Sequence, residues 1–200
     1  MRHDKYAYRS FPSEVGMHRN VDSQATQDYD YWSSSLEDLG MTNKIKSRAD
    51  LVGILNALRA QRTRIVFTNG CFDLMHVGHT RYLQAARELG DVLVVGVNTD
   101  ASARTLDKGN TRPIVPESQR AEVLAALACV DYVVLFEEPD PGCLIDELQP
   151  DVLVKGGDWA PDQIIGRDTV ESRGGIGRTI PLVPGVSTTN LVKQIQGLKA

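Results

Sequence analysis

Residues 92–97 (VLVVGV) form the feature that most constrains how this chain can fold. The run contains no polar residue, so it lacks the alternation that would leave one face of a strand in water. A continuous apolar run of this kind is typical of a parallel strand that is buried on both faces. Parallel neighbours are joined by crossover connections, usually helices, that cover the sheet. The run therefore predicts an α/β fold.

Strand-like and helix-like segments alternate on both sides of this run. Ser47 or Asp50 can cap the first helical segment and Ser187 the last, while Pro181 and Pro184 indicate that the last strand lies at a sheet edge. The expected strands are 64–68, 92–97, 132–136, 152–154 and 179–183, and the expected helices are 51–58, 79–89, 118–128, 141–148, 162–173 and 189–198. This alternation predicts a Rossmann-like, doubly wound parallel sheet of about five strands.

Residues 65–79 (IVFTNGCFDLMHVGH) join the first expected strand to a helix. The Asn-Gly pair at 69–70 predicts a turn, and His76 and His79 are spaced to face the same way at the helix start. Such a junction directs free backbone N–H groups and the positive end of the helix dipole at one spot, which suits a phosphate. Gly78 would let the backbone approach that phosphate closely. By itself, a histidine pair is more often structural or metal-binding.

The residues of this junction fit the transfer of a nucleotidyl group to a phosphate nucleophile. That nucleophile is already ionised near neutral pH, so donors and cations are needed rather than a strong base. His76 and His79 can donate hydrogen bonds to a triphosphate and to the transition state. Thr68 and Asn69 can bond phosphate or sugar, whereas Phe72 more simply packs the loop.

Two further loops are expected at the same edge, because the carboxyl ends of parallel strands meet there. After the second strand, Asp100 can bind a sugar hydroxyl, and Lys108 and Arg112 can meet anions or be ordinary surface charges. After the fourth strand, Lys155 precedes Gly156 and can reach a phosphate, since glycine leaves room for a nucleotide.

The start of the last expected helix and the loop at 159 contain further candidates, each of which has a possible structural role and a possible binding role. Ser187, Thr188 and Thr189 are first of all helix caps, and they can also hold a β- or γ-phosphate. Trp159 can stack near a base or simply anchor its loop.

Composition excludes several other classes of protein. The net charge of −4 gives no support for nucleic-acid binding, and the three scattered cysteines indicate a reducing cytosol rather than disulfides or zinc. No apolar run approaches the roughly 20 residues of a membrane span, and the first fifteen residues lack a signal-peptide core. We therefore expect a cytoplasmic protein with neither nucleic-acid nor membrane partners.

Taken together, several segments resemble one family closely. They are TNGCFDLMHVGH (68–79), VGVNTDASAR (95–104), RPIVPESQRAEVLAALACVDYVVLFEE (112–138), LIDELQPDVLVKGGDW (144–159), IIG (164–166) and VSTTNLVKQI (186–195). Within the HxGH nucleotidyltransferases, they resemble the D-glycero-β-D-manno-heptose 1-phosphate adenylyltransferases, either free-standing or as the C-terminal half of a bifunctional kinase/adenylyltransferase. The resemblance covers residues 45–197 approximately.

The resemblance implies an enzyme that transfers AMP from ATP to heptose 1-phosphate, giving ADP-heptose and pyrophosphate for the inner core of lipopolysaccharide. It implies catalytic roles for His76, His79 and Lys108. The residues expected to bind the nucleotide are Thr68, Asn69, Gly70, Phe72, Gly78, Lys155, Gly156, Asp158, Trp159, Ser187, Thr188 and Thr189. Those expected to bind the sugar phosphate are Asp73, Asn98, Asp100 and Arg112.

The resemblance also suggests a homo-oligomer and, through ATP, a requirement for Mg²⁺. No carboxylate cage is visible, so no metal ligands are predicted. Residues 1–42 are polar and fall outside the resemblance; they are interpreted as a poorly ordered extension, or as one whose aromatic residues pack on the domain or on a partner subunit. The nucleotidyltransferase domain is then 43–200, and a heptose kinase is expected on a separate chain.

Two alternatives stay open. Glycerol-3-phosphate cytidylyltransferases share several of these elements but carry an arginine-containing RTEGIST segment, where this chain has LVPGVST at 182–188. The added spacing between Arg104 and Gly109 also departs from the family pattern and makes Lys108 the best candidate for its motif lysine. A catalytically silent nucleotide-binding module is the second alternative.

Overall fold

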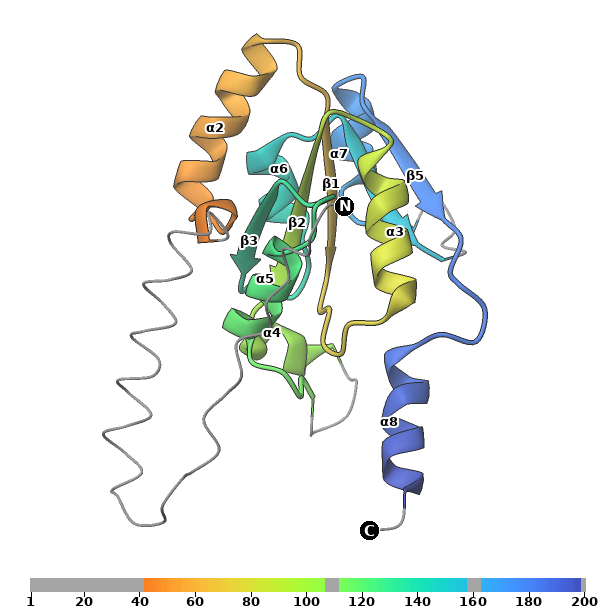
Figure 1. Ribbon diagram of the computed structural model, residues 1–200. Coiled ribbons are helices and arrows are strands. Elements are labelled where there is room, and N and C mark those ends of the chain that lie inside the picture. The colour runs from red at the N-terminus through yellow and green to blue at the C-terminus, as the bar shows by residue number, and fades with distance from the viewer. Residues whose placement is uncertain (1–41, 107–111, 158–162, 199–200) are drawn as a thin grey trace, which may run out of the picture. The chain divides into compact units, whose positions relative to one another are not determined.

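The computed structural model describes residues 42–106, 112–157 and 163–198. The expected extension at 1–42 therefore lies almost wholly outside the described residues. The part described contains a five-stranded sheet in the order β3-β2-β1-β4-β5, and all four strand pairs are parallel. Its strands are β1 (Ile65–Gly70), β2 (Val92–Asn98), β3 (Tyr132–Phe136), β4 (Val152–Gly156) and β5 (Ile176–Ile180). The predicted doubly wound sheet is confirmed (Figure 1).

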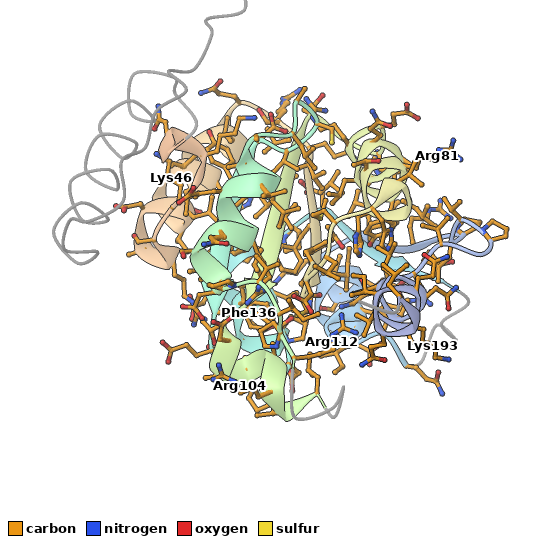
Figure 2. The ribbon with its side chains drawn as sticks, turned by 60° about the horizontal axis from the view of Figure 1, so that its bottom comes forward. Lys46, Arg81, Arg104, Arg112, Phe136 and Lys193 are labelled. Carbon is orange, nitrogen blue, oxygen red and sulfur yellow. The ribbon has the colours of Figure 1, made fainter. Side chains whose placement is uncertain are left out.

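The strand order places β1 at the centre of the sheet, so its carboxyl end lies in the middle of the edge formed by the strand ends. The chain proceeds from β1 to β2 and β3 on one side, and then continues with β4 and β5 on the other. A parallel sheet whose strand order reverses in this way leaves a crevice beyond the strand ends at the switch point. Here that point lies between β1 and β4. Figure 2 turns this end of the sheet toward the viewer.

Helices connect the strands, and five of the six expected helices begin within three residues of the predicted position, whereas the one expected from residue 162 begins at Arg167. Ser47 caps α2, since its side chain accepts a hydrogen bond from the amide of Asp50, and Ser187 caps α8 through the amide of Asn190. Both predicted caps are confirmed. The helices are α2 (Arg48–Ala60), α3 (Val77–Arg87), α4 (Asp100–Thr105), α5 (Glu117–Ala125), α6 (Gly142–Leu148), α7 (Arg167–Ser172) and α8 (Thr188–Gly197), and a short 3₁₀ turn, η1, covers Thr42–Lys44. No described helix is long and apolar enough to cross a membrane.

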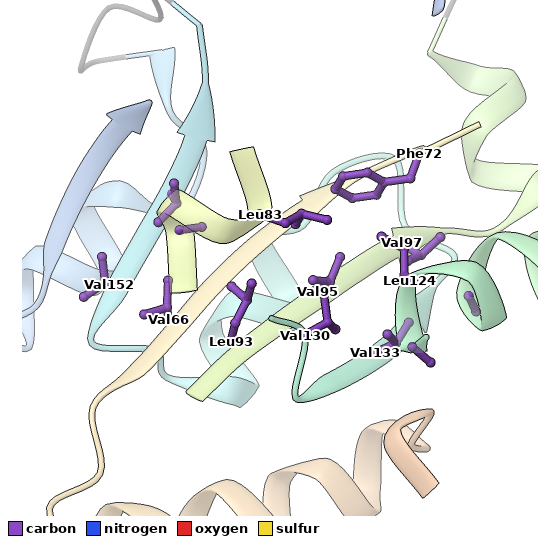
Figure 3. Close-up of a cluster of buried hydrophobic side chains, with 14 residues drawn as sticks. Val66, Phe72, Leu83, Leu93, Val95, Val97, Leu124, Val130, Val133 and Val152 are labelled. Carbon is purple, nitrogen blue, oxygen red and sulfur yellow. The ribbon is translucent and has the colours of Figure 1, made fainter. Parts of the chain in front are cut away.

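Hydrophobic side chains cover both faces of the sheet, as the apolar run of β2 predicts. Leu93, Val95 and Val97 join the cluster formed with α3 and α5, which Figure 3 shows. Val94 points to the other cluster, formed with α2, α6 and α7. Because burial on both faces holds β1 and β2 rigidly, the loops that leave their carboxyl ends start from fixed positions.

Three local expectations were wrong. Residues 69–70 do not form a turn but continue β1, because β2 extends alongside and offers Gly96 and Val97 as pairing partners. The last strand lies three residues earlier than expected and ends immediately before Pro181, which has no N–H for a further ladder bond. Part of the expected loop at 98–112 is helix α4, whose cap Thr99 accepts a hydrogen bond from the amide of Ser102.

Candidate active site

A cavity of about 390 Å³ lies beyond the carboxyl end of β1. Its walls come from the end of β1 and the loop that follows, the first turns of α3, the end of β4 and the segment that leads into α8. The lining residues are Asn69, Gly70, Cys71, Phe72, Asp73, His76, Gly78, His79, Tyr82, Arg112, Gly156, Leu182, Val183, Val186, Ser187, Thr188 and Thr189. Twelve of the nineteen residues predicted from sequence are in this set.

The two histidines form the centre of the cavity wall. The rings of His76 and His79 are stacked, with centroids 3.9 Å apart and planes at 16°. Phe72 packs edge-on against His79 at 5.5 Å, as its predicted packing role requires. A Cβ at Gly78 would lie 2.9 Å from the ring of His76. Only glycine at this position therefore lets the His76 ring fold back beside His79.

His76 occupies the N-cap position of α3 but makes no capping bond with its side chain. Its Nδ1 atom is buried and has no hydrogen-bond partner among the described residues. Burial lowers the pKa of His76, and a backbone hydrogen bond opposes the shift only in part. The ring is therefore neutral near pH 7, with one N–H to donate.

The start of α8 forms another part of the cavity wall. Ser187 uses its hydroxyl oxygen to accept the amide of Asn190 at 3.1 Å, and the hydroxyl of Thr188 donates to the carbonyl of Leu74 at 3.3 Å. The second bond ties the helix to the loop after β1. Two helix N-termini, those of α3 and α8, thus border one cavity, and their free amides and dipoles favour an anion there.

The residues at the ends of β1 and β4 divide into two groups. Thr68 is fully buried and shares a 2.7 Å hydrogen bond with the hydroxyl of Tyr82, whose pKa is raised by burial. Lys155 donates to the side-chain oxygen of Asn69. Thr68 and Lys155 are not among the lining residues, whereas Asn69 and Gly156 are. The structure thus places Thr68 and Lys155 just behind the cavity wall.

Asp73 and Arg112 hold each other at the edge of the cavity. The buried Asp73 carboxylate accepts from the Nε of Arg112 at 3.0 Å and from the amides of Ile114 and Val115 at 2.8 and 2.9 Å. All of these bonds cross a gap of about forty residues in the sequence, so Asp73 fixes the segment that precedes α5 to the loop after β1.

Asn98 and Asp100 are not brought into the cavity. The amide group of Asn98 donates to the hydroxyl of Ser102 at 2.9 Å, and the Asp100 carboxylate accepts from Arg120 at 2.7 Å. Lys108, Asp158 and Trp159, which the sequence also singled out, lie outside the described residues.

Arg120 is a central residue that the sequence reasoning missed. Its guanidinium is buried and donates to the carbonyls of Val115, Cys71 and Asn98 as well as to the carboxylate of Asp100. It therefore joins the loops that follow β1 and β2. The sequence did contain one indication that Arg120 is buried: it lies four residues before Leu124, and therefore on the same face of α5. The contributions of Tyr82 and Leu182 to the cavity carried no distinct signal, because both resemble ordinary packing residues.

The described residues do not form a metal cage. No group of three His, Cys, Asp or Glu side chains among them could hold an ion. The carboxylate of Asp73, which lies at the cavity, is already engaged by three N–H donors. Neither observation supports direct coordination of a metal by this part of the chain.

Comparisons with known proteins agree with this geometry. The model of the family described as cytidylyltransferase-like matches residues 67–194. The bifunctional protein HldE of Syntrophotalea carbinolica is 55% identical over 153 residues, which make up 76% of this chain and 31% of that protein. The protein of the same name from Trichlorobacter lovleyi is 53% identical over 161 residues, or 80% of this chain and 33% of that protein. The chain spans about a third of the length of these relatives.

A solved structure is similar as well. The lipopolysaccharide core biosynthesis protein from Thermoplasma volcanium GSS1 matches with a TM-score of 0.51 and 30% sequence identity. The match covers 60% of this chain and 97% of that protein's chain.

Proposed function

The chain belongs to the cytidylyltransferase-like family, and we propose that it transfers the adenylyl group of ATP to D-glycero-β-D-manno-heptose 1-phosphate. The products are ADP-heptose, for the inner core of lipopolysaccharide, and pyrophosphate. One observation carries the proposal: two stacked histidines at the N-terminus of α3 and the N-terminus of α8 line the same cavity.

The proposed reaction is an in-line displacement at the α-phosphorus of ATP. A phosphate oxygen of the acceptor forms the new P–O bond, and the bond to the β-phosphate oxygen breaks, so that pyrophosphate leaves with the electron pair. The protein has to position two anions and stabilise the charge on the transferring group. His76 and His79 donate hydrogen bonds to that group, and the amides at the start of α8, with Ser187 and Thr188, hold the leaving phosphates.

The sugar and the base are inferred from the relatives and from sequence segments, whereas the reaction class is inferred from the cavity. The matched relatives are bifunctional proteins of which this chain covers about a third, and the similar structure is named for lipopolysaccharide core biosynthesis. The segments 68–79, 95–104 and 144–159 resemble the heptose 1-phosphate adenylyltransferases in particular. Together these observations favour heptose 1-phosphate and ATP over other pairs.

The remaining assignments stay predictions. Mg²⁺ would enter with the triphosphate rather than through a protein cage, because such ions keep several waters and bind substrate phosphates. A homo-oligomer and a cytoplasmic location are likewise expected. Lys108, Asp158 and Trp159 keep their predicted roles in catalysis and nucleotide binding.

The test is pyrophosphate release by the purified protein with Mg²⁺. ATP, CTP and GTP are each supplied alone, with heptose 1-phosphate, and with glycerol 3-phosphate. Release that requires both ATP and heptose 1-phosphate is the expected result. Release with CTP and glycerol 3-phosphate would move the protein to the cytidylyltransferases, and no release with any pair would favour a silent module.

A further inference from the structure

We infer that Arg112 is the cation that selects the phosphate of the acceptor, and that Asp73 positions this guanidinium rather than binding the sugar. The inference rests on the proposed transfer and refines it. It changes the role of Asp73, which the sequence placed among the ligands of the sugar phosphate.

Asp73 has little capacity left for a ligand, because three of the roughly four acceptor positions of its carboxylate are already used. Its side chain is 1% exposed. One carboxylate oxygen accepts the amides of Ile114 and Val115, and the other accepts the Nε of Arg112. Because the side chain is almost fully buried, a sugar hydroxyl has little access to the one remaining acceptor position, and displacing one of the three donors would leave an N–H unsatisfied.

Arg112, in contrast, keeps donors for a ligand. Its Nε is held by Asp73, while its two terminal NH₂ groups have no partner among the described residues. Its side chain is 17% exposed and lines the same cavity as the histidines. Among the described residues that line this cavity, Arg112 is the one with a permanent positive charge. A guanidinium held by its Nε presents the planar fork that matches a phosphate.

The strand order indicates which phosphate this is. Arg112 precedes α5, which packs on β2 and β3, whereas α8 and Gly156 follow β5 and β4 on the other side of β1. The histidines, which follow β1, lie between the two sides. In an in-line displacement the attacking and leaving oxygens are on opposite sides of the phosphorus. With the leaving pyrophosphate at the start of α8, the nucleophilic phosphate lies on the side of Arg112.

A second buried charge keeps this arrangement rigid. Asp73 binds the amide of Val115, and Arg120 donates to the carbonyl of the same residue at 2.9 Å. Arg120 also binds the carbonyl of Cys71, two residues before Asp73. The segment that carries Arg112 is therefore clamped from both sides onto the loop that leads to the histidines.

The experiment compares Michaelis constants for the two substrates. Arg112→Ala is expected to raise KM for the acceptor roughly 10- to 100-fold, the loss typical of a charged hydrogen bond, with KM for ATP within about threefold. Arg112→Lys should fall in between, because the charge remains without the fork. Asp73→Asn should raise the same KM. The double variant Asp73→Asn/Arg112→Ala should have the same KM for the acceptor as Arg112→Ala alone, since the two residues act as one unit.

Arg81→Ala is the matched control, because Arg81 is exposed on α3 and does not line the cavity (Figure 2). An increase in KM for ATP instead of the acceptor would overturn the assignment of Arg112. Additive effects of the two substitutions would overturn the positioning role of Asp73. If Asp73→Asn does not fold, the Arg112 variants still decide the substrate assignment.

Calorimetric titration separates this inference from the proposed function. If the wild type releases no pyrophosphate with any pair, the proposed function fails. Binding of heptose 1-phosphate that is weakened by Arg112→Ala, with ATP binding intact, would still support the inference. Equal binding of the sugar phosphate by both proteins, or by neither, would refute it.

Discussion

The two ends of the sheet use charged residues in different ways. At the amino end, several charged side chains bond the backbone where strands begin and helices end: Asp91, Asp131 and Asp151 accept the amides of Arg64, Leu93 and Ile65, and Arg59 donates to the carbonyl of Leu148 at the end of α6. These bonds finish strands and helix C-termini, where a cation opposes the negative end of the dipole.

At the carboxyl end, the buried charges join loops instead. Arg120 and Asp73 connect segments that are separated by twenty to fifty residues, and they leave His76 and Arg112 directed at a cavity. The amino end thus uses its charges to stabilise the fold, whereas the carboxyl end directs part of its polar groups into the cavity where we place the reaction. Substitutions at the two ends should therefore separate stability from activity.

The largest effect is expected for Arg120→Met. The substitution leaves the carbonyls of Cys71 and Asn98 and the carboxylate of Asp100 without their shared partner. Leaving two carbonyls and a partly exposed carboxylate without their buried donor costs about 3–5 kcal/mol of the free energy of unfolding. Urea unfolding measures the loss. Arg59→Met, at the amino end, should cost only about 1 kcal/mol, and an equal loss for both would remove the distinction between the ends.

His76→Ala should have the largest effect on activity alone. Removing one preorganised donor to the transferring group lowers kcat by about 10²–10³-fold. The side chain makes no capping bond and is not part of the hydrophobic clusters, so the unfolding free energy should change little. Steady-state pyrophosphate release provides the measurement. A variant as active as the wild type would refute the catalytic assignment.

Asp151→Ala is the reciprocal change at the amino end. It removes the acceptor of the amide of Ile65, a buried residue, and should cost about 1–3 kcal/mol of stability. Both kcat and the two KM values should stay unchanged. Glu171→Ala, which removes an exposed pair with Arg167, is the control and should cost less than about 0.5 kcal/mol. A specific loss of kcat in Asp151→Ala would show that the two ends are coupled.

The helix caps offer a smaller, matched comparison. Ser47 and Ser187 cap α2 and α8 in the same way, but α2 buries Leu51 and Leu55 whereas α8 buries none of its residues. Ser47→Ala should therefore cost about 1 kcal/mol in thermal unfolding with no effect on activity. Ser187→Ala should hardly change the global transition and should raise KM for ATP. The reverse result would mean that α8 is part of the cooperative core.

The contrast between the ends also explains what the sequence could predict. The apolar run of β2 and the spacing of His76 and His79 are local patterns, so the sheet, the caps and the histidine cluster followed from them. The clamp of Arg120 and Asp73 could not be predicted, because its partners are distant in the sequence and are backbone carbonyls and amides, which every residue has. The extension of β1 through residues 69–70 likewise depends on the neighbouring strand.

The smallest expected effect concerns pH. Burial lowers the pKa of His76 from its ordinary 6.5, so the folded protein binds a proton there less readily than the unfolded chain. Above pH 6.5 the ring is neutral in both the folded and the unfolded chain, and protonation costs no stability. As the pH falls from 6.5 toward the lower folded pKa, the unfolded chain takes up the proton first and the free energy of unfolding decreases. His76→Gln removes the titration, and the loss of stability between pH 7 and about pH 5 should be smaller in this variant than in the wild type. His79→Gln is the comparison variant, because it removes the ring stacked on His76 but keeps the His76 ring itself. Urea midpoints at matched ionic strength report the difference, and parallel curves for wild type and His76→Gln would show that the His76 ring is no harder to protonate in the folded protein than in the unfolded chain.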